Sequence, residues 1–167
     1  AIDVRAGVLH PGGERLWKLG VEREETVKYS AEVLQELVQY VEGTPLTLCL
    51  ENSWHYQDTM HLVDTIDSPK LATCMDTGHL NLNDSHWSGY IKWAGKRLKA
   101  IHIADNLGVT DNHILPYGPG TIDWNGFGEA LKAVDFQGLF NFEVGGESSN
   151  RPLNVRLAKL AYIKQLA

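Results

Sequence analysis

The chain has 167 residues, with 15 Lys or Arg against 21 Asp or Glu, so its formal net charge is −6. This length fits one ordinary domain over residues 1–167, and 43% hydrophobic residues exclude a disordered or collagen-like chain. The acidic balance argues against a nucleic-acid partner. No apolar run approaches the ~20 residues of a membrane span, so no membrane partner is expected.

The cysteines and the N-terminal residues predict a reducing compartment. Cys49 and Cys74 lie in separate apolar, strand-like runs, where we expect buried thiols rather than a disulfide. Residues 1–5 lack the basic and apolar regions of a signal peptide. A cytoplasmic location is the resulting expectation.

Strands and helices are expected to alternate along the chain. A strand at 6–10 precedes a turn at 11–13, and a helix over about 24–41 follows, because apolar residues recur there at helical spacing. The further strands are expected at 46–51, 71–76, 100–104 and 139–144, and the further helices around 60–66, 85–98, 124–134 and 153–166. Near-continuous apolar strands between helices indicate a parallel sheet in an α/β protein.

Each expected strand ends in a side chain that can act as a ligand. These residues are His10, Glu51, Asp76, His102 and Glu143. Because strand side chains alternate between faces, one polar residue at each carboxyl end can point to a common centre. In a (β/α)8 barrel those ends form the active-site face, whereas an open doubly wound sheet gathers ligands at a single switch point. The repeated placement favours a TIM barrel.

The length allows only part of such a barrel. A full barrel takes roughly 250 residues, so five βα units leave three units, roughly 90 residues, unaccounted for. We therefore expect a partial TIM barrel, with about five βα units present and the first three missing. Two sheet edges would then be open. A second copy of the chain or a complementing N-terminal barrel fragment would cover them.

The residues that converge predict a metal site. Glu51, Asp76, His102 and Glu143 offer three carboxylates and one imidazole. Hard oxygen donors with a single nitrogen suit Mn²⁺, Mg²⁺ or Co²⁺, and a carboxylate-rich Zn²⁺ site is also compatible with them. Each residue alone reads as an ordinary strand-end cap or core group, but four on consecutive parallel strands favour ligation.

Six segments carry these residues in a specific order. They are Leu-Cys-Leu-Glu-Asn-Ser at 48–53, Cys-Met-Asp-Thr-Gly-His at 74–79, Ile-His-Ile-Ala-Asp-Asn at 101–106, Asp-Asn-His at 111–113, Gly-Pro-Gly-Thr-Ile-Asp-Trp at 118–124 and Phe-Glu-Val at 142–144. Together they resemble the xylose isomerase-like TIM-barrel superfamily, and the resemblance covers nearly the whole chain. Members of that superfamily include sugar isomerases, 3-epimerases, inosose dehydratase-type enzymes and endonuclease IV.

The resemblance implies the roles of the strand-end residues. Glu51, Asp76, His102 and Glu143 would be the shared metal ligands. Glu51 and Glu143 would also be catalytic and flank the two faces of a substrate. One would remove a proton next to a carbonyl and the other would return it, while the metal stabilises an enediolate.

Further residues are expected to bind substrate. His79 would contact substrate oxygens, and His10 would face the same cavity. Asp111 and His113 form an Asp-x-His pair that many sugar isomerase-like members keep. In endonuclease IV a similar pair, together with a histidine at the place of His79, holds a third zinc. The pair therefore discriminates poorly between the two activities.

Aromatic side chains near the strand ends could stack on a sugar. They are Trp54, Tyr56, Trp87, Tyr117 and Trp124. Ordinary packing of loops onto the barrel mouth explains each of them equally well. We count Trp54 among the expected substrate-binding residues.

The resemblance and the loops together favour a metal-dependent sugar isomerase or epimerase that acts on a small polyol or ketose. The stretches 52–69, 80–91 and 103–131 contain no Lys or Arg. A protein that grips a nucleic-acid backbone needs cations there, so an endonuclease IV-like zinc phosphodiesterase acting on abasic DNA is the second reading. The third is an inactive, metal-binding fragment of such a barrel.

Overall fold

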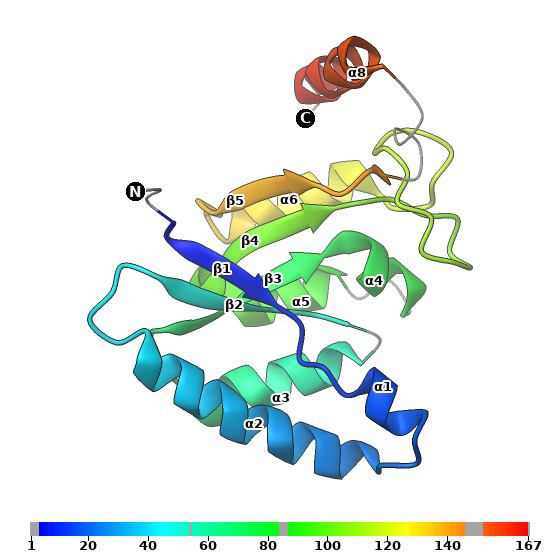
Figure 1. Ribbon diagram of the computed structural model, residues 1–167. Coiled ribbons are helices and arrows are strands. Elements are labelled where there is room, and N and C mark those ends of the chain that lie inside the picture. The colour runs from blue at the N-terminus through cyan, green and yellow to red at the C-terminus, as the bar shows by residue number, and fades with distance from the viewer. Residues whose placement is uncertain (1–3, 54, 84–86, 146–151, 167) are drawn as a thin grey trace.

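A computed structural model describes residues 4–53, 55–83, 87–145 and 152–166. Within them one parallel sheet has its strands in the order of the chain, β1-β2-β3-β4-β5 (Figure 1). The strands are β1 Ala6–Leu9, β2 Thr47–Glu51, β3 Leu71–Asp76, β4 Leu98–Ile103 and β5 Leu139–Phe142. Sequential parallel order in a curled sheet is the arrangement of a barrel, so the expected α/β class and partial TIM barrel are confirmed.

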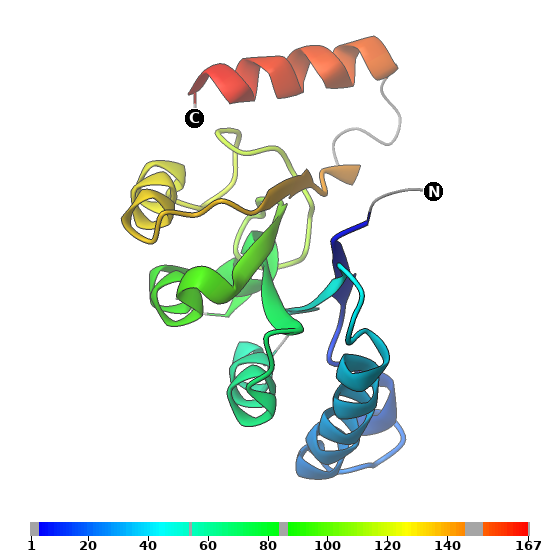
Figure 2. The same cartoon turned by 90° about the vertical axis from the view of Figure 1, so that its left-hand side faces the viewer.

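The helices lie mainly on the outer side of the curled sheet. They are α1 Glu14–Trp17, α2 Arg23–Tyr40, α3 Tyr56–Ile66, α4 Thr77–Leu82, α5 Trp87–Ala94, the 3-10 helix η1 Gly95–Arg97, α6 Trp124–Ala133 and α8 Leu153–Leu166. Figure 2 shows α2, α3, α5 and α6 following one another along the outer face, with α8 set apart. Among the described helices, none combines the length and the apolar character that crossing a bilayer requires.

The main core fills the space between this outer face and the helices. Leu34 and Val38, one turn apart on α2, pack in a cluster with Leu50 of β2. Ile101 of β4 belongs to a second cluster with Tyr90 of α5 and further residues of α6. Both clusters follow from the helical spacing of apolar residues and the apolar strands.

The inner face of the sheet carries small residues below the strand ends. Cys49, Ala72, Cys74 and Ala100 form one buried cluster. Both cysteines are free and buried, as expected. Burial raises the pKa of the Cys49 thiol to about 11, and it also raises that of Cys74. Neither thiol therefore forms a reactive thiolate at neutral pH.

Several element boundaries differ from the prediction. The helix expected over 85–98 ends at Ala94, because Gly95 has φ +51 and turns the chain out of the helix. The strand expected at 100–104 consequently starts earlier, at Leu98. The strand expected at 139–144 ends at Phe142, so Glu143 lies one residue beyond it. Two short helices, α1 and α4, were not predicted.

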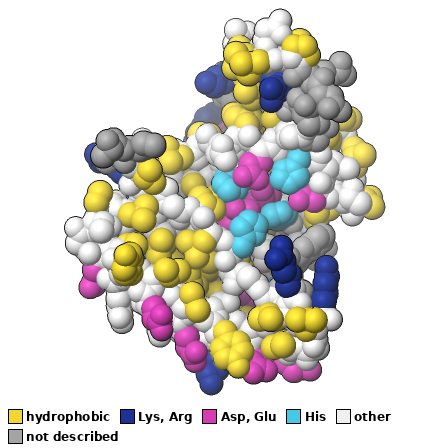
Figure 3. All heavy atoms as spheres, in the orientation of Figure 1, with side chains coloured by type: hydrophobic (Ala, Val, Ile, Leu, Met, Phe, Trp, Pro, Cys, Tyr) yellow, Lys and Arg dark blue, Asp and Glu magenta, His cyan; other side chains and the backbone are white. Residues whose placement is uncertain are grey.

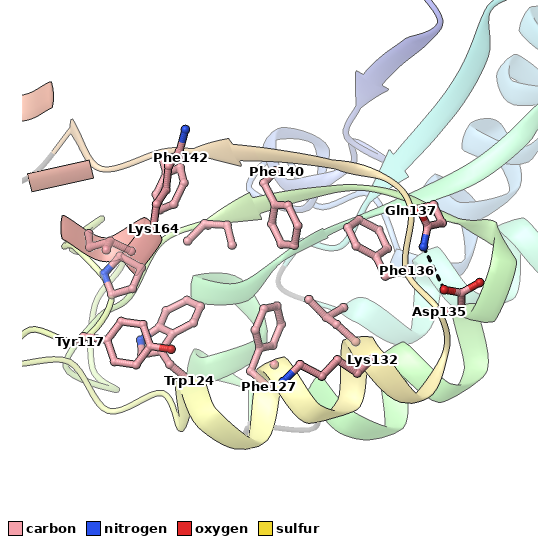
Figure 4. A pocket seen from close by; sticks show the side chains of 15 residues that line it. Tyr117, Trp124, Phe127, Lys132, Asp135, Phe136, Gln137, Phe140, Phe142 and Lys164 are labelled. Carbon is pink, nitrogen blue, oxygen red and sulfur yellow. Dashed lines mark hydrogen bonds between the residues drawn. The ribbon is translucent and has the colours of Figure 1, made fainter. Parts of the chain in front are cut away.

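The two outer strands leave apolar side chains exposed. In β5, Leu139 is 60% and Phe140 is 54% exposed, and Val8 of β1 is 39% exposed. A cavity of about 570 Å³ lies between α6, β5 and α8, with Phe127 and Phe140 among its lining residues (Figure 4). None of the expected metal ligands lines this cavity. Within the part of the chain that the structure describes, each outer strand thus has one neighbouring strand and an exposed apolar surface.

The buried face of β4 provides a test of the fold. Ile101 is 0% exposed, so Ile101→Ala leaves a cavity and should lower the free energy of unfolding by about 2–5 kcal/mol. Leu19 is 80% exposed, and Leu19→Ala should change it by less than about 0.5 kcal/mol. Urea unfolding followed by circular dichroism measures both. Equal effects of the two substitutions would contradict this core.

Candidate metal and substrate site

The carboxyl ends of the strands bring the four expected ligands together. Glu51 and Asp76 are the last residues of β2 and β3, and His102 lies opposite Asp76 in the register of β3 and β4. Glu143 follows β5 directly. Figure 3 shows acidic and histidine side chains gathered into one group on this face.

Both glutamates approach the same imidazole nitrogen. His102 Nδ1 lies 2.9 Å from Glu51 Oε2 and 3.1 Å from Glu143 Oε1. The Glu51 side chain is 2% exposed and the Glu143 side chain 34% exposed. The two residues expected to be catalytic therefore converge on one ring nitrogen, one of them buried and the other partly exposed.

Three buried polar atoms in this group have no hydrogen-bond partner among the described residues. They are Glu51 Oε2, Asp76 Oδ2 and His102 Nδ1, and the short approach of Glu51 to His102 lacks the direction of a hydrogen bond. Asp76, His102 and Glu143 each offer one ligand atom, and these three atoms lie within 4.8 Å of one another. Buried polar atoms without partners are costly, and a cation among them removes that cost. The side chains therefore fit a divalent metal.

Asn52 fixes the backbone of Asp76. Its Oδ1 accepts a hydrogen bond from Asp76 N at 2.8 Å, and its Nδ2 donates to Asp76 O at 3.1 Å. Asp76 Oδ1 in turn caps α4 by accepting from His79 N at 2.7 Å. This cap occupies one carboxylate oxygen and leaves Oδ2 for the site. We did not predict this role for Asn52, although it directly follows Glu51 in the Glu-Asn-Ser motif.

His79 lies between the buried carboxylates of Glu51 and Asp76 and the more exposed carboxylate of Asp111. Its Nδ1 lies 3.0 Å from Asn52 O, and because a carbonyl only accepts, this nitrogen carries a proton. Its Nε2 lies 3.4 Å from Asp111 Oδ2. Burial alone would lower the pKa of His79, but the Asp111 and Asp76 carboxylates raise it to about 9.

Asp111 and His113 continue this chain of contacts to the other glutamate. His113 Nε2 lies 2.9 Å from Asp111 Oδ2, and His113 Nδ1 donates to the backbone carbonyl of Glu143. The backbone of His113 has φ +49, a left-handed conformation that is uncommon outside glycine. The structure thus brings together His79, Asp111 and His113, three of the five residues expected to bind substrate. We name these three the mouth triad.

The remaining expected substrate residues differ in position. His10 is 59% exposed, and its Nε2 lies 3.5 Å from Glu51 Oε2, so it borders the same group. Trp54 lies outside the described residues. Trp124 is buried and donates a hydrogen bond to Asp105, and Tyr56 stacks edge-on against Tyr90. Packing, rather than sugar stacking, explains these two aromatic residues.

The burial of Asp76 predicts a pH-dependent cost. Burial raises the pKa of Asp76 from 3.8 to about 6, so the folded chain holds this proton more tightly than the unfolded chain. Stability that depends on this group therefore falls as pH rises from about 4 to about 6, and the cost persists above that range.

Asp76→Asn removes this titration. With a chelator present, we compare the free energies of unfolding of Asp76→Asn and the wild type. The value for the variant minus that for the wild type should increase by about 2 kcal/mol between about pH 4.5 and about pH 8. Urea unfolding at several pH values measures the difference. A difference that stays constant with pH would show that Asp76 is not buried as a charge.

Comparison with known proteins identifies the family. The family model of the xylose isomerase-like TIM barrel matches residues 1–166. D-psicose 3-epimerase of Enterocloster bolteae is 28% identical over 103 residues, which cover 62% of this chain and 30% of that protein. A D-tagatose 3-epimerase-like structure superposes with a TM-score of 0.78 at 24% identity, over 96% of this chain and 61% of that one.

A structure of the IOLI protein with a bound zinc atom superposes with a TM-score of 0.75 at 23% identity, again over 96% of this chain and 61% of that one. In each of these comparisons the chain spans less than two thirds of the length of the relative. The family match nevertheless extends over almost every residue and agrees with the parallel sheet. The chain belongs to the xylose isomerase-like TIM barrel family.

Proposed function

We propose that this chain carries the active site of a divalent-metal-dependent sugar isomerase or epimerase. Its reaction is the transfer of a proton next to a carbonyl of a small polyol or ketose. The observation that carries the proposal is the approach of Glu51 and Glu143 to the same nitrogen of His102, at 2.9 and 3.1 Å. Two carboxylates held around one point suit the removal and the return of a proton.

The metal ligands in this proposal are Glu51, Asp76, His102 and Glu143. The oxygen-rich donor set suits Mn²⁺, Mg²⁺ or Co²⁺, and so do the buried atoms of Glu51, Asp76 and His102 that have no partner among the described residues. Zinc is also compatible, and the IOLI relative was solved with a zinc atom. When bound, such a cation supplies a positive charge that stabilises negative charge on substrate oxygens.

The two glutamates would exchange protons with one substrate carbon. The carboxylate of one would take the proton from the carbon next to the carbonyl, and the electron pair of the broken C–H bond would move toward the carbonyl to give an enediolate. The other, in its acid form, would donate a proton. Donation to the opposite face of the same carbon is epimerisation. Donation to the former carbonyl carbon, with the hydroxyl proton of the first carbon passing to the former carbonyl oxygen, is isomerisation.

The mouth triad would orient the substrate. His79 and His113 each have Nδ1 directed at a backbone carbonyl, so both rings are held in fixed orientations. Their Nε2 atoms flank Asp111 Oδ2, at 3.4 and 2.9 Å, and would offer hydrogen bonds to hydroxyl oxygens. His10 borders the same space from the opposite strand and would contact the substrate from there.

The relatives support a small sugar as substrate. The relatives include a D-psicose 3-epimerase and a D-tagatose 3-epimerase-like protein, and both names refer to ketose sugars. We do not favour the alternative of a nuclease acting on abasic DNA, because the stretches 52–69, 80–91 and 103–131 contain no Lys or Arg side chains that would neutralise phosphates. Isomerisation and epimerisation share the enediolate, so both stay within the proposal.

A closed cavity requires cover for the edges of β1 and β5. The related chains are longer, and matching segments of theirs account for only part of their length. We propose that further barrel strands, from a complementing segment or a second copy of the chain, close the gap between β1 and β5. Leu139 and Phe140 would then be buried at the new contact.

Deuterium exchange tests the proton transfer directly. Purified protein supplied with Mn²⁺ should incorporate deuterium from D₂O into a ketohexose such as D-psicose, at a carbon next to the carbonyl, as detected by NMR. Glu143→Gln cannot exchange this proton and should reduce the rate by at least about 100-fold.

Glu129→Gln is the matched control, because Glu129 is 75% exposed on α6 and pairs only with Lys132 among the contacts described for it. Its rate should equal that of the wild type. If Glu143→Gln exchanged deuterium as fast as the wild type, Glu143 would not be one of the proton-transfer residues.

A further inference from the structure

The segment between β4 and α6 carries two of the mouth-triad residues with little regular structure of its own. It runs from 104 to 123 and includes Asp111 and His113. Within it, Asp105 and Ile114 form an antiparallel bridge. The backbone nitrogen of each residue lies 2.9 Å from the carbonyl oxygen of the other. Long loops usually move more than the elements that they connect. A fixed position of the triad therefore needs a further restraint.

A buried carboxylate at the start of the loop provides it. Asp105 is 1% exposed and accepts hydrogen bonds from four N–H groups. The donors are Asn106 N at 2.8 Å, Thr121 N at 3.1 Å, Ile122 N at 3.3 Å and Trp124 Nε1 at 2.7 Å. Three of these donors lie at the far end of the loop. One side chain thus holds both ends of the segment together.

The close approach at this point requires a glycine. A Cβ on Gly120 would lie 2.0 Å from Asp105 Cγ, and no side chain fits at that distance. Gly120 is therefore explained by the carboxylate against which it packs. No substrate or metal contact is needed to account for it.

The next residue connects the loop to the helix of His79. Asn106 is 0% exposed, and its Nδ2 donates to Gly78 O at 2.8 Å. A Cβ on Gly78 would lie 3.3 Å from Asp76 Oδ1 and 3.4 Å from Asp111 Oδ1. Asp76 and Asp111 therefore both lie close to the same point of α4, where a side chain in place of Gly78 would be tightly packed.

We propose that Asp105 is a positioning residue for the mouth triad. By joining both ends of the 104–123 segment, it places Asp111 and His113 where they contact His79 and Glu143. The hydrogen bonds of its own carboxylate all go to residues outside the metal-ligand set. The placement of the triad stands on the structure alone, whereas its effect on substrate binding rests on the function proposed above.

Asp105→Asn tests this role with minimal change of shape. An amide has one acceptor oxygen, and its NH₂ group would face at least one of the four N–H donors, so a buried hydrogen bond is lost. The ring ¹H–¹⁵N NMR signals of His113 and His79 should shift and broaden as the triad loses its fixed geometry. In the sugar reaction KM should rise about tenfold with a smaller change in kcat.

A double-mutant cycle separates positioning from general destabilisation. If Asp105 acts through the triad, Asp105→Asn combined with His113→Ala should raise KM by clearly less than the product of the two single effects. Asp123→Asn is the matched control, because Asp123 caps α6 through Gly126 N and lies at the edge of the same segment. It should leave the histidine signals and KM unchanged.

Two results would overturn the proposal: unchanged histidine ring signals in Asp105→Asn, or fully additive effects on KM in the cycle. The NMR readout needs no substrate. If the protein does not act on sugars but the ring signals shift as expected, the positioning role stands and the proposed function fails.

Discussion

The burial of two carboxylates at neighbouring strand ends is the constraint on which the rest of the structure depends. Glu51 is 2% and Asp76 is 0% exposed, and each has one oxygen without a hydrogen-bond partner among the described residues. Buried charge without compensation is costly, so the surrounding residues are arranged either to hold these groups or to leave room for a cation. Asn52 holds the Asp76 backbone, and His79 approaches both carboxylates. The site thus departs from maximal stability where its chemistry requires it.

The strand ends, the α4 helix and the loop after β4 each contribute residues to this group. Parallel strands bring their carboxyl ends to one rim, and small inner residues such as Cys49 and Cys74 lie beneath it. The α4 helix starts from Asp76 itself, so the residue that faces the site also determines where His79 lies. The loop after β4 completes the rim with Asp111 and His113, and its position depends on hydrogen bonds that form only in the folded chain.

The parallel sheet and the meeting of polar residues at its strand ends could be predicted from the sequence. The period-two alternation of strands and the placement of polar residues at strand ends predict that Glu51, Asp76 and His102 meet. The roles of Asn52 and Asp105 could not be predicted, because each depends on hydrogen bonds to segments about 20 residues away in the chain. The hydrogen bond from Trp124 to Asp105 also holds this aromatic side chain in the interior. The sequence alone leaves both packing and sugar stacking open for Trp124.

The central claim is that the strand-end residues form one cation site, and metal stoichiometry tests it most directly. Isothermal titration of Mn²⁺ into chelator-treated protein, with elemental analysis of the complex, should give about one ion per chain for the wild type and greatly weakened binding for Glu51→Gln. Glu129→Gln, on the exposed face of α6, should bind like the wild type. Undetectable binding by the folded wild type, or equal binding by Glu51→Gln, would contradict the account.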